Sequence, residues 1–223
     1  MSVERHLNIR VDEYDARIRT FVPGYEEMIA NVALTVAGHP RCKVIVECGP
    51  GTGALTAECL AALPAARAVG IEIDGAIVEL ARRRLAAMAD RASFVEGSFL
   101  EMALPPCDAL VACLALHHVH SREQKQALYD RIRRAVGPAG IFVTADCFPS
   151  RDPARARAEH AAWHQHLHKS YSEAETESYF ESWSREDRYF PLEDEIEMMQ
   201  RAGFAPEVIW RGAPMAVVAA LAR

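Results

Sequence analysis

A glycine-rich stretch constrains the fold of this chain more than any other feature of its sequence. Residues 44–53 read Val-Ile-Val-Glu-Cys-Gly-Pro-Gly-Thr-Gly, and apolar residues follow at helical spacing. This order predicts a strand, a glycine loop and a helix. Glycine has no Cβ, so a ligand can approach the loop closely, and the helix directs its free N–H groups and positive dipole end into the same space. The stretch therefore predicts a binding site for a nucleotide-like ligand.

Polar residues after the next two predicted strands favour this interpretation over an ordinary turn. The strand expected at residues 68–73 carries Glu72, about 20 residues after the loop, where a carboxylate can bind ribose hydroxyls. A strand expected at residues 92–95 is followed by Glu-Gly-Ser-Phe at 96–99. The loop spacing is Gly-x-Gly-x-Gly, which differs from the Gly-x-Gly-x-x-Gly of dinucleotide-binding proteins.

The alternation of strand-like and helix-like segments predicts an α/β fold with a doubly wound, mostly parallel, seven-stranded sheet. Further strands are expected at residues 108–116 and 141–148, and an antiparallel pair at 206–211 and 215–221 is expected to close the sheet. Ligands of such sheets bind beyond the carboxyl ends of the strands. That rule gathers one set of residues around a crevice: Gly49, Gly51, Gly53, Glu72, Ser98, His117 and Asp146.

Composition limits the domain organisation and the partners. We expect one domain over residues 1–223, with a helical cap at 1–40 and a helical lid inserted at 149–190. The net charge of −6 argues against nucleic acid as a partner, and no run approaches the roughly 18 apolar residues of a membrane span. The six scattered cysteines are interpreted as reduced, which with the polar N-terminus indicates a cytoplasmic protein. A homodimer is left open.

The ordered motifs over residues 40–148 resemble those of class I S-adenosylmethionine (SAM)-dependent methyltransferases, which have a Rossmann-like fold. The resemblance implies SAM as the cofactor. It implies that Glu47 and the loop glycines Gly49, Gly51 and Gly53 bind the methionine end of SAM. It further implies that Glu72 binds the ribose and that the residues after the third strand flank the adenine.

A narrower resemblance covers most of residues 15–222. Four segments are similar to the carboxy-SAM synthase of tRNA wobble-uridine modification: Phe-Val-Pro-Gly-Tyr at 21–25, Ser-Arg-Glu-Gln-Lys-Gln-Ala-Leu at 121–128, Tyr-Ser-Glu at 171–173 and Arg-Ala-Gly-Phe at 201–204. This resemblance implies a set of cofactor contacts: Tyr25, Gly49, Glu72, Ile73, Ser98, Phe99 and Cys113. The chain departs from the synthase at Tyr179-Phe180, where the synthase has an arginine for the extra carboxylate, and at Cys113, which replaces a polar amide. SAM itself is therefore the expected cofactor.

Methyl transfer from SAM is an in-line displacement, so the main task of the protein is to orient the nucleophile. A general base is needed only where the nucleophile must lose a proton. His117 and His118 follow the fourth predicted strand and Asp146 ends the fifth, so these three residues are candidates for catalysis, together with His164 in the lid. The alternative for the two adjacent histidines is that they only form hydrogen bonds with the loop.

The predicted lid at residues 149–190 is rich in aromatic residues and histidines. Trp163, Tyr171, Tyr179 and Trp183 are candidates for a pocket that binds an apolar or aromatic substrate, and plain packing between lid and sheet is the alternative. His160, His164 and His168 share one face of a predicted helix and could bind zinc. The spacing places no carboxylate or cysteine ligand beside them, so no metal is expected.

The sequence thus predicts a SAM-dependent methyltransferase that acts on an oxygen or nitrogen atom of a small molecule. One alternative is an enzyme that consumes SAM without methylation, either as a carboxy-SAM synthase or by an intramolecular displacement that releases methylthioadenosine. Another is a SAM-binding module without turnover.

Overall fold

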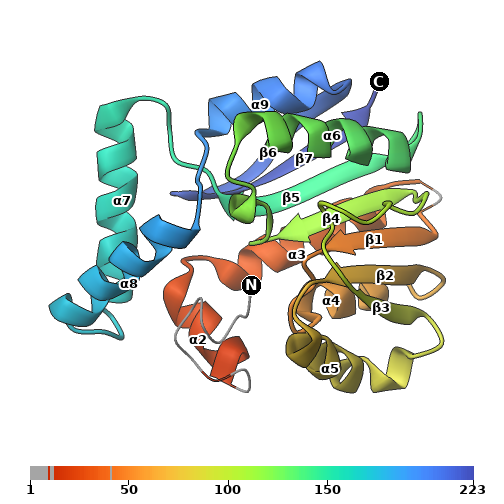
Figure 1. Ribbon diagram of the computed structural model, residues 1–223, viewed down its shortest axis with the longest axis horizontal. Helices are drawn as coiled ribbons and strands as arrows, with labels where there is room; N and C mark the ends of the chain where they lie inside the picture. Colours follow the sequence, from red (N-terminus) through yellow and green to blue (C-terminus); the bar gives the residue numbers. More distant parts are fainter. Residues whose placement is uncertain (1–9, 11–12, 41) are drawn as a thin grey trace.

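A seven-stranded sheet forms the centre of the molecule in the computed structural model, which describes residue 10, residues 13–40 and residues 42–223 (Figure 1). The strands are β1 (Val44–Cys48), β2 (Arg67–Glu72), β3 (Ala92–Glu96), β4 (Ala109–Cys113), β5 (Ile141–Cys147), β6 (Phe204–Gly212) and β7 (Met215–Ala222). Their order is β3-β2-β1-β4-β5-β7-β6, and only β7 runs antiparallel to its neighbours. The predicted fold class is confirmed, including the closing antiparallel pair.

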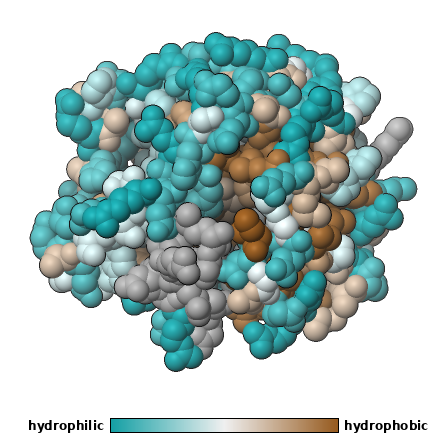
Figure 2. Space-filling view, in the orientation of Figure 1, coloured by the Kyte–Doolittle hydropathy of each residue, from teal (hydrophilic) through white to brown (hydrophobic). Residues whose placement is uncertain are grey.

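Helices cover both faces of the sheet. They are α2 (Tyr14–Phe21), α3 (Tyr25–Gly38), α4 (Ala54–Ala62), α5 (Gly75–Arg84), α6 (Arg122–Val136), α7 (Pro153–Leu167), α8 (Glu173–Glu186) and α9 (Leu192–Arg201), with short 3-10 turns η2 (Ala86–Met88) and η3 (Leu116–His118). Alternate strand residues point into two apolar cores: Ile45 packs with α3 and α4, and its neighbour Val46 packs with α6 and α9. Figure 2 shows hydrophobic side chains gathered in the middle of one face, between the more hydrophilic surfaces of α6 and α5.

Side-chain caps fix where several helices begin. Asp74 accepts a hydrogen bond from the Ala76 N–H at 3.0 Å and caps α5. Ser121 accepts one from the Gln124 N–H at 3.1 Å at the start of α6. The strand predicted at residues 108–116 is shorter than expected, because Leu114 adopts a positive φ of 52° and turns the chain into η3. This early turn brings His117 to the carboxyl end of β4.

Helices α7 and α8 form a hairpin beyond the carboxyl ends of the parallel strands, beside α2 (Figure 1). The indole N–H of Trp163 donates to the Phe21 carbonyl oxygen at 2.7 Å, which ties α7 to the end of α2. The Arg188 N–H donates to the His117 carbonyl oxygen at 2.8 Å, which ties the end of the hairpin to η3. The hairpin is thus anchored on both sides of the sheet end. None of the helices in the described part of the chain is long and apolar enough to cross a membrane.

Candidate functional site

The glycine loop between β1 and α4 borders a cavity of about 310 Å³. Gly49, Gly51 and Gly53 have φ values of 68°, 53° and 78°, which L-residues with side chains rarely adopt. A Cβ at Gly49 would lie 2.6 Å from the Ala115 Cβ, so this glycine is also required by close packing. Gly49 and Gly51 line the cavity. Gly53 lies outside its lining and packs against Leu85, where an added Cβ would come within 2.7 Å of a methyl group.

The structure brings most of the predicted cofactor-binding residues together. Those that line the cavity are Tyr25, Glu47, Gly49, Gly51, Glu72, Ile73, Ser98, Phe99 and Cys113. They come from the ends of β1, β2 and β4, from the loop after β3, and from α3. Parallel strands present their carboxyl ends at one edge of the sheet, which explains the convergence of residues that are far apart in the sequence.

Two buried carboxylates stand at the glycine-loop end of the cavity. Glu72 accepts hydrogen bonds from the N–H groups of Gly51 at 3.1 Å and Ile73 at 2.8 Å, so its side chain is held against the loop. Glu47 accepts a hydrogen bond from the Thr56 hydroxyl. Burial raises the pKa of Glu72, and it raises the pKa of Glu47 to about 7 against the opposing effect of Thr56. Both carboxyl groups have lost most of their contact with water on burial. Each is therefore suited to accept hydrogen bonds from a hydroxyl-bearing ligand or to pair with a cationic one.

His117 and Asp146 form a buried pair at the carboxyl ends of β4 and β5. His117 Nδ1 lies 2.7 Å from Asp146 Oδ1, and Asp146 Oδ2 accepts from the His117 N–H at 3.2 Å. Burial opposes the charge on each group, but their mutual attraction prevails, so the pKa of His117 is raised and that of Asp146 is lowered. A carboxylate at Nδ1 selects the tautomer with the proton on Nδ1 and leaves Nε2 as the acceptor.

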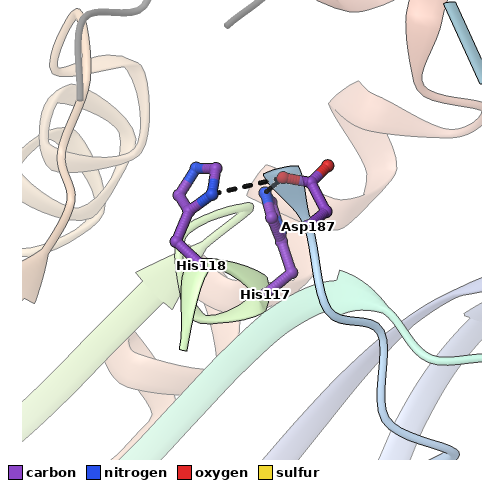
Figure 3. A group of neighbouring side chains, drawn as sticks. All are labelled: His117, His118 and Asp187. Atoms are coloured by element: carbon purple, nitrogen blue, oxygen red, sulfur yellow. Dashed lines mark ion pairs between the residues drawn. The ribbon is translucent and has the colours of Figure 1, made fainter. Parts of the chain in front are cut away.

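Asp187 joins the histidines from the lid (Figure 3). Its Oδ1 atom lies 3.3 Å from His118 Nδ1 and 3.8 Å from His117 Nε2, and its side chain is 2% exposed. The Tyr189 hydroxyl donates to Asp187 Oδ2 at 2.6 Å. Both histidines and Asp187 line the cavity. Asp187 is not among the residues predicted from the sequence, because no spacing rule connects the residue after a lid helix with the end of β4.

The lid aromatics divide into two groups. Trp163 and Trp183 line the cavity and stack on each other, with ring centroids 5.4 Å apart. Tyr171 and Tyr179 lie outside the lining and pack on Phe21, with centroid distances of 5.5 and 4.9 Å. For these two tyrosines the geometry is that of lid packing, because the lid buries its aromatic face on α2. Other aromatic residues that the sequence analysis did not select line the cavity: Tyr14, Phe21 and Tyr189.

His164 is separated from the other candidate catalytic residues. It lies on α7 outside the cavity lining, and its Nε2 atom is 3.0 Å from Glu177 Oε1 on α8. The ring therefore faces the second lid helix and not His117. Asp146 also lies outside the lining, but it reaches the cavity through its hydrogen bond with His117.

The glycine loop after β1, the acid at the end of β2 and the antiparallel closing pair define the class of protein as a Rossmann-like methyltransferase. A family profile described as an O-methyltransferase domain matches residues 8–182, so the chain belongs to this family. An uncharacterized methyltransferase from Bacillus licheniformis is 33% identical over 168 residues, which cover 74% of this chain and 73% of that protein. The chain spans about half the length of several other curated relatives that it matches.

Solved structures of methyltransferases share the fold. Human N-acetylserotonin methyltransferase, solved in complex with SAM, superposes with a TM-score of 0.67 at 18% identity over 99% of this chain and 57% of that one. The mitomycin 7-O-methyltransferase MmcR superposes with a TM-score of 0.69 at 18% identity, over 100% of this chain and 61% of that one. At such identities the superpositions demonstrate the shared architecture.

Proposed function

We propose that this protein binds SAM and transfers its methyl group to an oxygen atom of a small molecule. The observation that carries the proposal is one cavity whose lining includes the glycine loop and Glu72 together with His117, His118 and Asp187. Membership of the O-methyltransferase domain family favours oxygen over nitrogen as the acceptor atom. The SAM named for the human N-acetylserotonin methyltransferase structure supports the same cofactor here.

The loop end of the cavity is proposed to hold the cofactor. Glu72 would accept hydrogen bonds from the ribose hydroxyls, and Ile73, Ser98 and Phe99 would border the adenine. Glu47 would face the ammonium group of the methionine end. The positive charge of that group would favour the ionised form of Glu47. These roles follow the sequence resemblance, and the common lining of one cavity supports them.

The histidine end of the cavity is proposed to hold the acceptor. His117 would take the proton of the acceptor hydroxyl on Nε2, while Asp146 stabilises the resulting imidazolium through Nδ1. SAM bound beside the glycine loop would supply the methyl group to this oxygen, with S-adenosylhomocysteine as the by-product. Trp163 and Trp183 would cover the acceptor and exclude water. They favour an apolar or aromatic molecule.

A carboxylated cofactor is disfavoured by the charge of the cavity. Within the described lining there is no arginine or lysine to pair with an additional carboxylate. Arg185, the first arginine or lysine after Tyr179-Phe180 in the sequence, pairs with Glu181 on the exposed side of α8. We therefore propose a scaffold related to carboxy-SAM synthase that uses SAM itself. The limits of the cap and lid, a cytoplasmic location and a homodimer stay predictions from the sequence.

Mass spectrometry of the by-products tests this proposal. The protein is incubated with SAM and a set of hydroxylated aromatic molecules, and we expect S-adenosylhomocysteine to form with at least one of them. His117→Ala should abolish its formation without loss of SAM binding in calorimetry. Methylthioadenosine as the product would show that SAM is the substrate of another reaction, and SAM binding without any product across acceptor classes would identify a binding module.

A further inference from the structure

The lid contains a second group of histidines that the proposed reaction does not use. His164 lies in the last turn of α7, and His168 is the residue that follows this helix, one helical turn later. Glu173 and Glu177 lie one turn apart on α8. His164 Nε2 is 3.0 Å from Glu177 Oε1 and 3.7 Å from Glu173 Oε1. His168 Nε2 is 2.9 Å from Glu173 Oε2. The two imidazoles and the Glu173 carboxylate therefore converge, and the Glu177 carboxylate lies beside His164.

We propose that this group binds a divalent transition-metal ion of the zinc class. In a tetrahedral zinc site, nitrogen and oxygen ligand atoms lie about 2.0–2.1 Å from the ion and therefore roughly 3.3 Å from one another. One ligand atom from each of His164, His168 and Glu173 lies within 4.8 Å of the others, and the measured pairs at 2.9 and 3.7 Å bracket the tetrahedral value. Glu177 adds a carboxylate 3.0 Å from His164 Nε2, beside this group of three ligand atoms.

The ligands are held in place before an ion binds. The Ser172 side chain and Glu175 form a capping box, which fixes the first turn of α8 and so the direction of Glu173. The His164 ring is parallel to the Phe180 ring, with an interplanar angle of 3° and centroids 6.0 Å apart. The two imidazoles are half-buried and the two carboxylates are exposed, which gives an ion access from solvent.

An ion at this position would fasten the two lid helices to each other. Phe180, which packs on His164, also contacts Trp163 and Trp183 at centroid distances of 5.2 and 5.6 Å. Both tryptophans line the cavity. The ion would therefore stabilise the part of the lid that covers the acceptor end. Without an ion, exposed imidazole–carboxylate pairs of this kind contribute little to stability.

Titration of the untagged full-length protein with Co²⁺, followed by visible absorption, tests the site without SAM or an acceptor. We expect one equivalent of Co²⁺ to bind with a tetrahedral spectrum, and the affinity to fall at least about tenfold in His164→Ala and in Glu173→Gln. His160→Ala is the matched control, because this histidine lies one turn earlier on the same helix and is not among the converging ligands. Zn²⁺ should raise the thermal midpoint of the wild type and of His160→Ala but not of His164→Ala.

A second variant separates this site from the cavity. His117, His118 and Asp187 also present three ligand atoms within 4.8 Å of one another. Asp187→Asn should therefore leave the Co²⁺ spectrum and affinity unchanged. Loss of Co²⁺ binding in Asp187→Asn with retention in His164→Ala would overturn the proposal, as would the absence of any stoichiometric binding by the wild type. Neither result depends on whether the protein methylates an acceptor.

Discussion

At the scale of residues, the two carboxylates at the loop end of the cavity differ in how they are held. Glu72 is fixed by backbone N–H groups, including that of Gly51 at 3.1 Å, and so points at a defined position beside the loop. Glu47 is held by the Thr56 hydroxyl, and burial keeps its pKa near 7. The first arrangement suits a neutral diol and the second suits a cation that arrives with the ligand. Each carboxylate therefore gives a separate test of the cofactor site.

Replacement of Glu72 by alanine should weaken SAM binding by about 1.5–3 kcal/mol, because hydrogen bonds between a carboxylate and the ribose hydroxyls would be lost. Isothermal titration calorimetry measures the change. The matched control is Glu79→Ala, since Glu79 is an exposed carboxylate on the neighbouring helix α5 that pairs with Arg82. An unchanged affinity in a folded Glu72→Ala protein would remove this residue from the binding site.

The affinity for SAM should depend on pH through Glu47. Below its pKa of about 7 the carboxyl group is protonated in the free protein, and a proton must leave before it can pair with the ammonium group. Affinity should therefore fall with decreasing pH, approaching about tenfold per pH unit below that value. Glu47→Gln should bind more weakly and lose this dependence between pH 5.5 and 7.5. A slope that persists in the glutamine variant would assign the titration to another group.

At the scale of elements, a buried ion pair joins α6 to α9 behind the histidines. Lys125 Nζ lies 3.0 Å from Glu195 Oε1, and both side chains are 1% exposed. The Tyr129 hydroxyl also donates to Glu195, and Lys125 donates to the Leu116 carbonyl oxygen at 2.6 Å. The pair therefore connects the helix layer to the turn that carries His117. A buried charge that loses its partner is costly, whereas removal of both charges is well tolerated.

Lys125→Met should lower the free energy of unfolding by about 3–5 kcal/mol, because Glu195 would be left buried without its cation. Denaturant unfolding followed by circular dichroism measures this quantity. The double variant Lys125→Met/Glu195→Leu should recover most of the loss, since no charge then remains unpaired. If the single and double variants are equally unstable, packing and not charge pairing is the reason.

The aromatic residues of the lid hairpin have two roles: some fasten the lid to α2, and others line the cavity. Phe21 at the end of α2 packs on Tyr171 and Tyr179, which fastens the lid to the cap side of the molecule. Trp163 and Trp183 line the cavity. The helical period alone cannot separate these two groups, because only Tyr179 and Trp183 share a helix, whereas Trp163 lies on α7 and Tyr171 precedes α8. The position of α2 decides which of them stay available to a ligand.

At the scale of the whole molecule, the cavity lies where the cap helices, the sheet and the lid meet. Its lining includes Tyr14 from α2, Tyr25 from α3, Trp163 from α7 and Met215 from β7. A ligand in this cavity contacts segments from nearly the full length of the described chain. Binding should therefore stabilise the fold as a unit and not one element of it.

S-adenosylhomocysteine at 100 times its dissociation constant should stabilise the folded protein by about 2.7 kcal/mol. For a chain of this size, that corresponds to a rise in thermal midpoint of roughly 5–10 °C. Differential scanning fluorimetry measures the shift, with adenosine alone as the control ligand. A midpoint that does not move at saturating ligand would contradict the placement of the cofactor in this cavity.

Local patterns in the sequence were sufficient for the framework of the site. The strands, the glycine loop and the acid at the end of β2 follow from hydrophobic periodicity, glycine and turn chemistry, which depend on residues close together in the chain. The placement of Glu72 beside Gly51 follows in turn, because consecutive parallel strands end at the same edge of the sheet. These features required no knowledge of how the lid folds.

Only the tertiary structure decided which distant side chains meet. Asp187 reaches His118 because the α7–α8 hairpin returns to η3 and is tied there by the Arg188 N–H. The same hairpin brings Glu173 to His168 and turns His164 away from the cavity. Such contacts depend on the length and direction of the hairpin and on the aromatic packing that fixes it against α2. No local pattern encodes them, and so the sequence alone determined the glycine loop and the acid beside it, while the fold determined what closes the cavity.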